Sequence, residues 1–481
     1  MKHLFKIYCV IFHFIIHAQP PSKFYQRFGG NGYDVGYDVK QTLDSGYIIT
    51  GSTSSFGFGN TDLYVAKLDK MGQIKFQKSF GNFSNECGKS IVQLIDSSYV
   101  MLGYTNSSGF GGYDIYLVKI DKNGNLLWQK NYGGSDWDFG NSLQKTSDGG
   151  FIIAGTTYSF GRGDADGYII KTDALGNAIW TKTYGGINKD EFKSVIQTTD
   201  GGYALTGYTK SYLDNAFGDV WTFKLDALGD SVWCKFYGGV KEDFGNCIVE
   251  HPSGDMFIAG ATASIGNGLL DGYAIKINNI GNQLNHVTEG TSTFDEIFNS
   301  ITISKRNNII TVIEKEKFGG YKLQLKLMEL NLGLSYINAT DYGSIEDDEV
   351  FAIIPTFDKG YACTGSTLGF GSELTDVYFI KADSMLIGLN LNLVGISNNK
   401  KDNISFEVFP NPASSNFFLK IYADAPTSNI LFYNSLGEFI DLSQKLIHVS
   451  NKEITINISD LRNGFYYLRL GNNIRKICII H

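Results

Sequence analysis

The chain has 481 residues, of which 43% are hydrophobic and 14% aromatic, with 56 glycines and only 7 prolines. Its formal net charge of −8 excludes the extended basic face that phosphate contacts require, so we expect no nucleic acid among its partners. Strand-forming Tyr, Phe, Ile and Val, punctuated by Gly and Asn, predict an all-β chain.

Residues 1–18 have the pattern of a secretory signal peptide. Lys2 and Lys6 form a basic start, residues 7–16 form a short apolar core, and Ala18 precedes the expected cleavage point. The apolar run is too short to span a bilayer, so we expect no transmembrane segment in the mature chain. Five cysteines follow this leader, at irregular spacings and in odd number, and we expect mostly buried free thiols.

A unit of about 52 residues recurs seven times between residues 34 and 390. One carboxylate recurs near the start of each unit, two residues before its first predicted strand, with steps of 52 or 53 residues. These carboxylates are Asp34, Glu86, Asp138, Asp190, Asp243, Glu296 and Asp348. A glycine one third of the way through the unit repeats with the same period, except that Ile313 takes its place in the sixth unit. Periods of this size are typical of propellers, solenoids and arrays.

The third unit gives the clearest prediction of local structure. Residues 140–148, 151–159, 166–173 and 178–186 read as four short strands separated by glycine-rich or polar turns. The second strand is apolar on both faces, so it needs cover on both sides. A four-stranded sheet cannot supply that cover by itself, and stacking such sheets around an axis does.

The two ends of the repeat region complement each other. An aromatic residue of the fourth strand recurs at Phe76, Trp128, Trp180 and Trp233, and counting back 52 residues from Phe76 reaches Phe24. The seventh unit has no clear fourth strand after residue 383. We therefore predict a seven-bladed β-propeller over residues 19–383, in which residues 23–29 complete the last blade and remove two sheet edges.

The seven carboxylates fall at the connections between units and form the candidate binding site. One hypothesis is an acidic rim around the channel mouth that binds a cation, such as calcium, or a basic ligand. The alternative is that each carboxylate accepts backbone N–H groups and locks its own turn. Recurrence in every unit favours the alternative. Residues 164–167 only hint at a calcium loop, so we assign no metal and no cofactor.

A second recurring pattern predicts contacts between turns and strands. The turn between the first two strands carries an aspartate, and the end of the third strand carries a lysine. In the sixth unit Arg306 and Glu329 hold these two positions, so both signs are exchanged, whereas the fifth unit keeps Lys276 and has Ser253. The joint exchange predicts that the two positions touch. An exposed pair of this kind contributes only about 0–1 kcal/mol.

Motifs for catalysis are absent from the sequence. The histidines outside the leader are His251, His286, His448 and His481, and none belongs to a metalloprotease or nucleophile-elbow pattern. Paired carboxylates for glycoside hydrolysis stay open, because sequence does not give their separation. We assign no catalytic residue. The sixth unit departs most from the repeat, at Ile313, Gln324, Asn285 and Glu329.

After a linker at residues 384–404 the repeat ends, and residues 405–481 contain six or seven short strands with alternating patterning, as in a small β-sandwich. This segment carries Pro410, Asn411, Pro412, Gly437, Gly464, Tyr466 and Lys476. In order, spacing and position the segment resembles the type A sorting domain of the type IX secretion system. The resemblance implies contact with that machinery and export across the outer membrane of a Gram-negative bacterium to the cell surface or medium.

The sequence supports three hypotheses on function. The leading one is a secreted, non-enzymatic propeller that binds a glycan or a protein at the cell surface. The second is a polysaccharide-acting enzyme with its site on the acidic rim. The third is a structural component of a surface layer. A pocket with acids that break the sevenfold pattern would favour the enzyme.

Overall fold

The computed structural model describes residues 23–212, 217–317, 322–344, 346–369, 374–386, 406–421, 430–434, 440, 446–449, 453–470 and 473–481. The predicted signal peptide, most of the predicted linker and Gly437 lie outside these residues. The chain divides into two compact units, residues 1–395 and 396–481.

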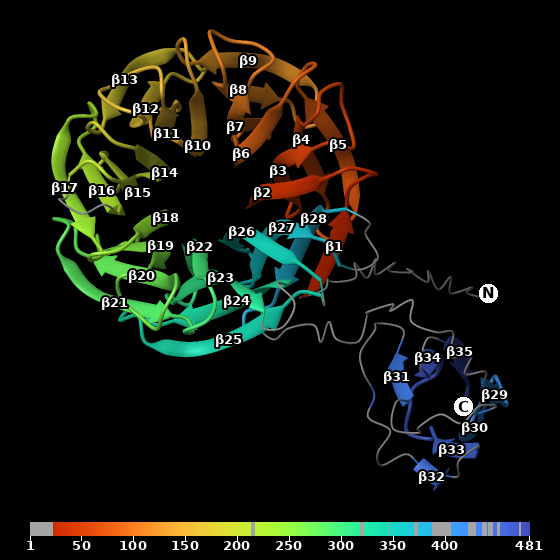
Figure 1. The fold of residues 1–481 in the computed structure, drawn as a ribbon. Helices are drawn as coiled ribbons and strands as arrows, with labels where there is room; N and C mark the ends of the chain where they lie inside the picture. Colours follow the sequence, from red (N-terminus) through yellow and green to blue (C-terminus); the bar gives the residue numbers. More distant parts are fainter. Residues whose placement is uncertain are drawn as a thin grey trace, which may run out of the picture. The chain divides into compact units, whose positions relative to one another are not determined.

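Seven four-stranded antiparallel sheets, the blades, form a ring within the first unit (Figure 1). Blade 1 consists of β2 (Asp34–Gln41), β3 (Tyr47–Thr53), β4 (Asp62–Leu68) and β5 (Ile74–Phe80). Blade 2 consists of β6 (Glu86–Gln93), β7 (Tyr99–Thr105), β8 (Asp114–Ile120) and β9 (Leu126–Tyr132). Blade 3 consists of β10 (Asp138–Lys145), β11 (Phe151–Thr157), β12 (Asp166–Thr172) and β13 (Ala178–Tyr184).

The next three blades repeat this order. Blade 4 consists of β14 (Asp190–Gln197), β15 (Tyr203–Thr209), β16 (Asp219–Leu225) and β17 (Ser231–Tyr237). Blade 5 consists of β18 (Asp243–Glu250), β19 (Met256–Thr262), β20 (Asp271–Ile277) and β21 (Gln283–Glu289). Blade 6 consists of β22 (Glu296–Ile303), β23 (Ile309–Lys317), β24 (Lys322–Leu330) and β25 (Tyr336–Tyr342).

Blade 7 joins the two ends of the repeat region. It contains β26 (Asp348–Pro355), β27 (Tyr361–Thr367) and β28 (Asp376–Ala382), and its fourth strand is β1 (Phe24–Phe28) from the N-terminal end. The pairing runs from Phe24 opposite Lys381 to Phe28 opposite Val377. The predicted seven-bladed propeller with a closing N-terminal strand is therefore confirmed.

Burial explains why the sheets stack. The second and third strands of a blade are buried on both faces, as in β11 and β12, whereas the outermost strand β13 is largely exposed. Apolar side chains of neighbouring blades form shared clusters; Ile152 and Ile169 of blade 3, for example, pack with Phe192 and Trp221 of blade 4. Each fully buried side chain of this size stabilises the fold by about 1.5–3 kcal/mol.

The innermost strand of every blade contains a bulge. In β10 the register against β11 shifts between Gly140 and Ser142, and the other six blades have the same shift. The bulge brings the backbone of the first strand so close to the second that a Cβ on Gly155 would lie 2.0 Å from the carbonyl oxygen of Phe139. This close approach accounts for the recurring glycine.

Two details of the sequence prediction need correction. The innermost strands begin at the recurring carboxylate itself, because Asp138 already pairs with Thr157, and not two residues later. Asn285 lies on β21 and therefore in the fifth blade, not the sixth. All five cysteines beyond the leader are free, as predicted, but only Cys87 and Cys363 are buried, so the expectation of mostly buried thiols is wrong.

The C-terminal unit contains two small antiparallel sheets. One has the strand order β29 (Phe406–Phe409), β30 (Asn416–Ile421), β33 (Glu453–Asn457) and β32 (Leu446–Val449). The other has the order β31 (Ile430–Asn434), β34 (Gly464–Leu470) and β35 (Asn473–Ile479). Phe417 and Ile454 of the first sheet share a buried core with Phe432, Leu468 and Ile477 of the second, which confirms the expected small β-sandwich.

Candidate functional site

The seven recurring carboxylates, called here the turn carboxylates, are buried, with exposed fractions of 0–1%. Asp190 shows their contacts: Oδ2 accepts hydrogen bonds from the Gly186 N–H at 2.7 Å and the Ser211 hydroxyl at 2.5 Å, and Oδ1 accepts one from the Thr209 hydroxyl. The backbone of the preceding turn donates to the other six in the same way. These contacts give each carboxylate a local role in its turn, and its role in binding stays a prediction.

A second carboxylate approaches the first at most blade interfaces. A Cβ on Gly133 would lie 2.1 Å from Asp114 Oδ1 and 2.7 Å from Asp138 Oδ2, so the two side chains meet over this glycine. Burial raises the pKa of Asp114, and the charge of Asp138 adds to this effect. Within the described residues, Oδ1 of Asp114 and Oδ1 of Asp138 accept no hydrogen bond, and no group of three acidic, His or Cys side chains is placed to hold a metal.

The predicted contact between the turn aspartate and the strand lysine is present. Lys171 Nζ lies 2.9 Å from Asp148 Oδ2, and the corresponding pairs of blades 1, 2, 4 and 7 are 3.0, 3.8, 3.0 and 2.8 Å apart. Burial alone would raise the pKa of Asp148, but hydrogen bonds from Lys171 and Thr146 lower it to about 2. With exchanged signs, Arg306 Nη2 lies 2.7 Å from Glu329 Oε1.

In blade 5 the strand lysine forms its ion pair with an aspartate at a different position of the turn. Lys276 lies 3.0 Å from Asp255, which is two residues after Ser253. Asp255 therefore supplies the carboxylate that is missing at Ser253, from a position further along the same turn.

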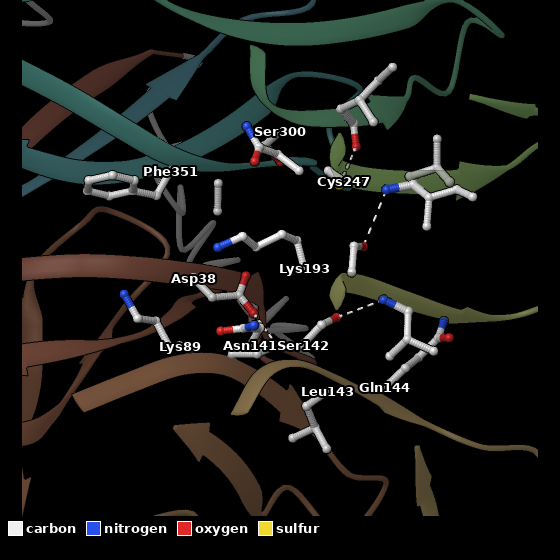
Figure 2. Close-up of a pocket in the computed structure, with 18 of the residues that line it drawn as sticks. Asp38, Lys89, Asn141, Ser142, Leu143, Gln144, Lys193, Cys247, Ser300 and Phe351 are labelled. Atoms are coloured by element: carbon white, nitrogen blue, oxygen red, sulfur yellow. Dashed lines mark hydrogen bonds between the residues drawn. The ribbon is translucent and has the colours of Figure 1, made fainter. Parts of the chain in front are cut away.

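The innermost strands line a central channel with a cavity of 330 Å³ (Figure 2). Successive side chains of the bulged innermost strands make different contacts. Asn141 lines the channel, whereas the Ser142 hydroxyl accepts a hydrogen bond from the N–H of Val195 in the next blade at 3.2 Å. Three positions after each turn carboxylate, the seven blades place Tyr37, Lys89, Asn141, Lys193, Asn246, Asn299 and Phe351 against the cavity. We call this set the channel ring.

Five aromatic side chains from blades 2 and 3 form a cluster at the start of the channel-lining strand β10. They are Tyr104, Tyr113, Trp137, Phe139 and Tyr158, and we call them the aromatic mouth. The Tyr113 and Trp137 ring centroids are 6.1 Å apart, and those of Tyr104 and Phe139 are 5.1 Å apart. Trp137 is 50% exposed. The position of Trp137 holds a polar residue in five of the other blades.

Two acids near the start of β26, Glu314 and Glu349, occupy positions that are not acidic in most other blades. Glu314 Oε2 accepts a hydrogen bond from Asn299 Nδ2 at 2.7 Å, and the same amide donates to the Val350 carbonyl oxygen at 3.1 Å. Glu349, the residue before Val350, accepts the Ser366 hydroxyl at 2.7 Å. Burial raises the pKa of Glu314, and the charge of Glu349 raises it further.

The motif of the C-terminal domain brings its first and last segments together. Asn411 Oδ1 accepts the Cys478 N–H at 2.8 Å, and Ala413 exchanges backbone hydrogen bonds with Cys478 and Ile480. Pro410 and Pro412 flank Asn411 in this segment. Gly464 begins β34, and the Tyr466 hydroxyl donates to the Arg462 carbonyl at 2.8 Å. Lys476 pairs with Tyr467 between β34 and β35.

Residues 407–479 match the family of the secretion system C-terminal sorting domain. The chain is thus an all-β protein that joins a seven-bladed propeller to a type IX sorting domain. The sorting domain indicates export across the outer membrane and implies interaction with the type IX secretion machinery. Among the described residues, no helix has the length and apolar character of a membrane span.

One curated relative is the regulatory protein FlaEY of Caulobacter vibrioides, 29% identical over 145 residues. The match covers 27% of this chain and only 15% of that relative. Similar solved structures include the Neurospora crassa Pan2 WD40 domain, with a TM-score of 0.46, 10% identity, and coverage of 76% of this chain and 97% of that one. An arabinofuranosidase from Fusarium graminearum has a TM-score of 0.41, 10% identity, and coverage of 78% and 96%.

The sequence analysis did not identify the aromatic mouth, the channel ring or the pair Glu314 and Glu349. The signal was nevertheless present. A position-by-position comparison of the seven units would have shown that Trp137, Lys89 and Glu349 each differ from the residues of most other units. The residues that recur in every unit, such as the turn carboxylates, stabilise the fold.

Proposed function

We propose that this protein is an exported binding module, presented at the cell surface or released, whose propeller binds a glycan at the aromatic mouth. The observation that carries the proposal is the exposure of Trp137 within a cluster of five aromatic rings at the start of β10. An exposed apolar patch of this kind, at a repeat position that is polar in five of the other six blades, indicates a binding surface.

A glycan suits the chemistry of the aromatic mouth. The C–H face of a sugar ring packs on the flat face of an indole or phenol, while its hydroxyls need hydrogen-bonding partners. The hydroxyls of Tyr113 and Tyr158 have no hydrogen-bonding partner among the described residues, and the neighbouring channel adds amides and serines. A standard protein interface buries about 800 Å² of surface on each partner, whereas only Trp137 and Tyr158 of the five rings are exposed.

The test is binding of the full chain to a glycan array, compared with Trp137→Ala. We expect saturable binding to at least one glycan class and a loss of about tenfold or more in affinity for the variant, because stacking area at the centre of a site carries much of the binding energy.

Tyr336→Ala is the matched control, because Tyr336 is also an exposed aromatic, 63% exposed, but lies on the outermost strand of blade 6. Equal losses in both variants, or saturable binding only to a surface protein, would contradict the glycan proposal.

A second candidate, hydrolysis of a glycosidic bond, rests on Glu314 and Glu349. A glycosidase uses two carboxyl groups, one kept protonated by a raised pKa to act as the acid and one ionised to act as base or nucleophile. The raised pKa of Glu314 fits the acid role. The glycans bound on the array should therefore be incubated with the protein, and release of products that Glu314→Gln abolishes would replace the binding proposal with this one.

A further inference from the structure

The channel ring carries positive charge that the protein does not fully neutralise. Lys89 forms no ion pair with any carboxylate of the described residues, and its Nζ lies 3.4 Å from the centre of the Tyr37 ring. Burial lowers the pKa of Lys89, and the charge of Lys193, which lines the same cavity, lowers it further.

The nearby carboxylates are already engaged. Lys193 lies 2.9 Å from Glu191, but Lys189 also pairs with Glu191 at 3.3 Å, so these three side chains retain a net charge of about +1. Asp38, also on the cavity wall, is held by Lys40 at 2.7 Å and accepts the Ile91 N–H. Neither acid is free to compensate Lys89.

Glu314 and Glu349 of blades 6 and 7 form no ion pair with Lys89 in the part of the chain that the structure describes. Their carboxylates accept hydrogen bonds from the neutral side chains of Asn299 and Ser366, as described above. The remaining polar members of the channel ring are neutral amides, and Asn141 and Asn246 each donate to a backbone carbonyl of the next blade. Figure 2 shows Lys89, Asn141 and Lys193 around the same cavity.

The cavity and the aromatic mouth share the strand β10. Phe139 belongs to the aromatic mouth and lies two residues before Asn141, which lines the cavity, and both side chains are partly exposed. Tyr37 and Phe351 add an aromatic pair to the wall of the channel itself, with ring centroids 4.9 Å apart. A chain that packs on Trp137 can thus extend toward the two lysines.

We propose that Lys89 and Lys193 bind an anionic group, a carboxylate or a sulfate ester, of an acidic sugar whose neighbouring units pack on the aromatic mouth. This inference rests on the proposed glycan binding and names the class of glycan. A charged ligand oxygen supplies the counter-ion that Lys89 lacks, and hydrogen bonds to a charged group are the stronger kind.

The experiment uses the full chain and matched pairs of oligosaccharides. Oligogalacturonate is compared with its carboxyl-reduced product, and a sulfated galactan oligosaccharide with its desulfated product. We expect one of the two acidic oligosaccharides to bind about tenfold more tightly than its neutral partner. Its affinity should fall as salt is added. The arm that shows the preference identifies the anionic group.

Lys89→Met retains the length of the side chain over Tyr37 and should abolish the preference, and Lys193→Met provides a second variant if the first does not fold. Lys78→Met, on the exposed outermost strand β5, removes one charge outside the channel and should leave the preference unchanged. Equal binding of acidic and neutral partners that Trp137→Ala weakens would overturn this inference and leave the proposed function standing. Absence of binding to every member would overturn this inference, and the glycan array with Trp137→Ala decides the proposed function separately.

Discussion

At the scale of single residues, the repeats explain which substitutions the fold tolerates. Lys171 is buried at the end of its strand and reaches both Asp148 and the carbonyl oxygen of Thr172, so the lysine closes a turn as well as an ion pair. Arg306 and Glu329 perform the same task with opposite signs. The ion pair between the turn and the end of the third strand therefore depends on the two positions being close, and it forms with either residue carrying the positive charge.

This equivalence gives a prediction for blade 6. Glu329→Lys places a lysine against Arg306 and should lower the free energy of unfolding by about 2 kcal/mol, because the Glu329 side chain is only 4% exposed. Adding Arg306→Asp recreates the pair of blades 1–4 and should recover most of the loss. Chemical denaturation of the wild type, both single variants and the double variant measures the coupling. Strictly additive effects would show that the two positions do not interact.

At the scale of elements, each blade depends on the turn that leads into it. Asp190 joins the turn at Gly186 to Thr209 and Ser211 at the end of β15, so one buried side chain holds the entry to β14 against the second strand. A carboxylate accepts several donors at once, which an amide side chain does only with one of its two atoms. The turn carboxylates therefore recur because every blade has the same turn to close.

Replacement of one turn carboxylate tests this role. Asp190→Asn should lower the free energy of unfolding by about 1–3 kcal/mol, because one buried oxygen is replaced by a donor that faces other donors. The matched control Asp164→Asn changes an exposed carboxylate in the loop after β11 and should have almost no effect. Thermal unfolding with calcium and with a chelator separates the two hypotheses on these carboxylates. We expect the same midpoint in both, and a lower midpoint in chelator would instead indicate a bound cation.

At the scale of the whole propeller, closure of the ring depends on a strand far away in sequence. β1 completes blade 7 through a ladder with β28, and Phe24 packs with Phe379 at a centroid distance of 5.8 Å. Without β1 the β28 edge would expose unpaired backbone groups.

Removal of the closing strand should therefore weaken the entire propeller. A chain that begins at residue 29 should unfold about 10 °C below one that begins at residue 19, because the apolar contacts of Phe24, Tyr25 and Phe28 are lost and the edge is exposed. A chain that begins at residue 23 retains β1 and serves as the control. Unfolding followed by circular dichroism checks the order, and identical midpoints for residues 19 and 29 would mean that blade 7 closes without β1.

The sequence by itself determined the architecture, because the architecture is periodic. Each unit must bury the same two faces, so the same residue types recur every 52 or 53 positions. Phe24 lies 52 residues before Phe76 and occupies the same position of the repeat. The ion pairs of the rim followed from the joint exchange at Arg306 and Glu329 for a similar reason. The motif around Asn411 likewise indicated the sorting domain that residues 407–479 match.

Only the tertiary structure decided where a ligand would find complementary groups. Trp137, Lys89 and Glu314 each belong to a different blade, and each has a neighbour from an adjacent blade: Tyr113, Tyr37 and Glu349, respectively. The sequence analysis considered the turn carboxylates as an acidic rim for binding. In the structure they are buried because their turns fold over them. Periodicity specifies how blades pack on one another, whereas the proposed binding site depends on side chains that depart from it and that the closed ring brings together.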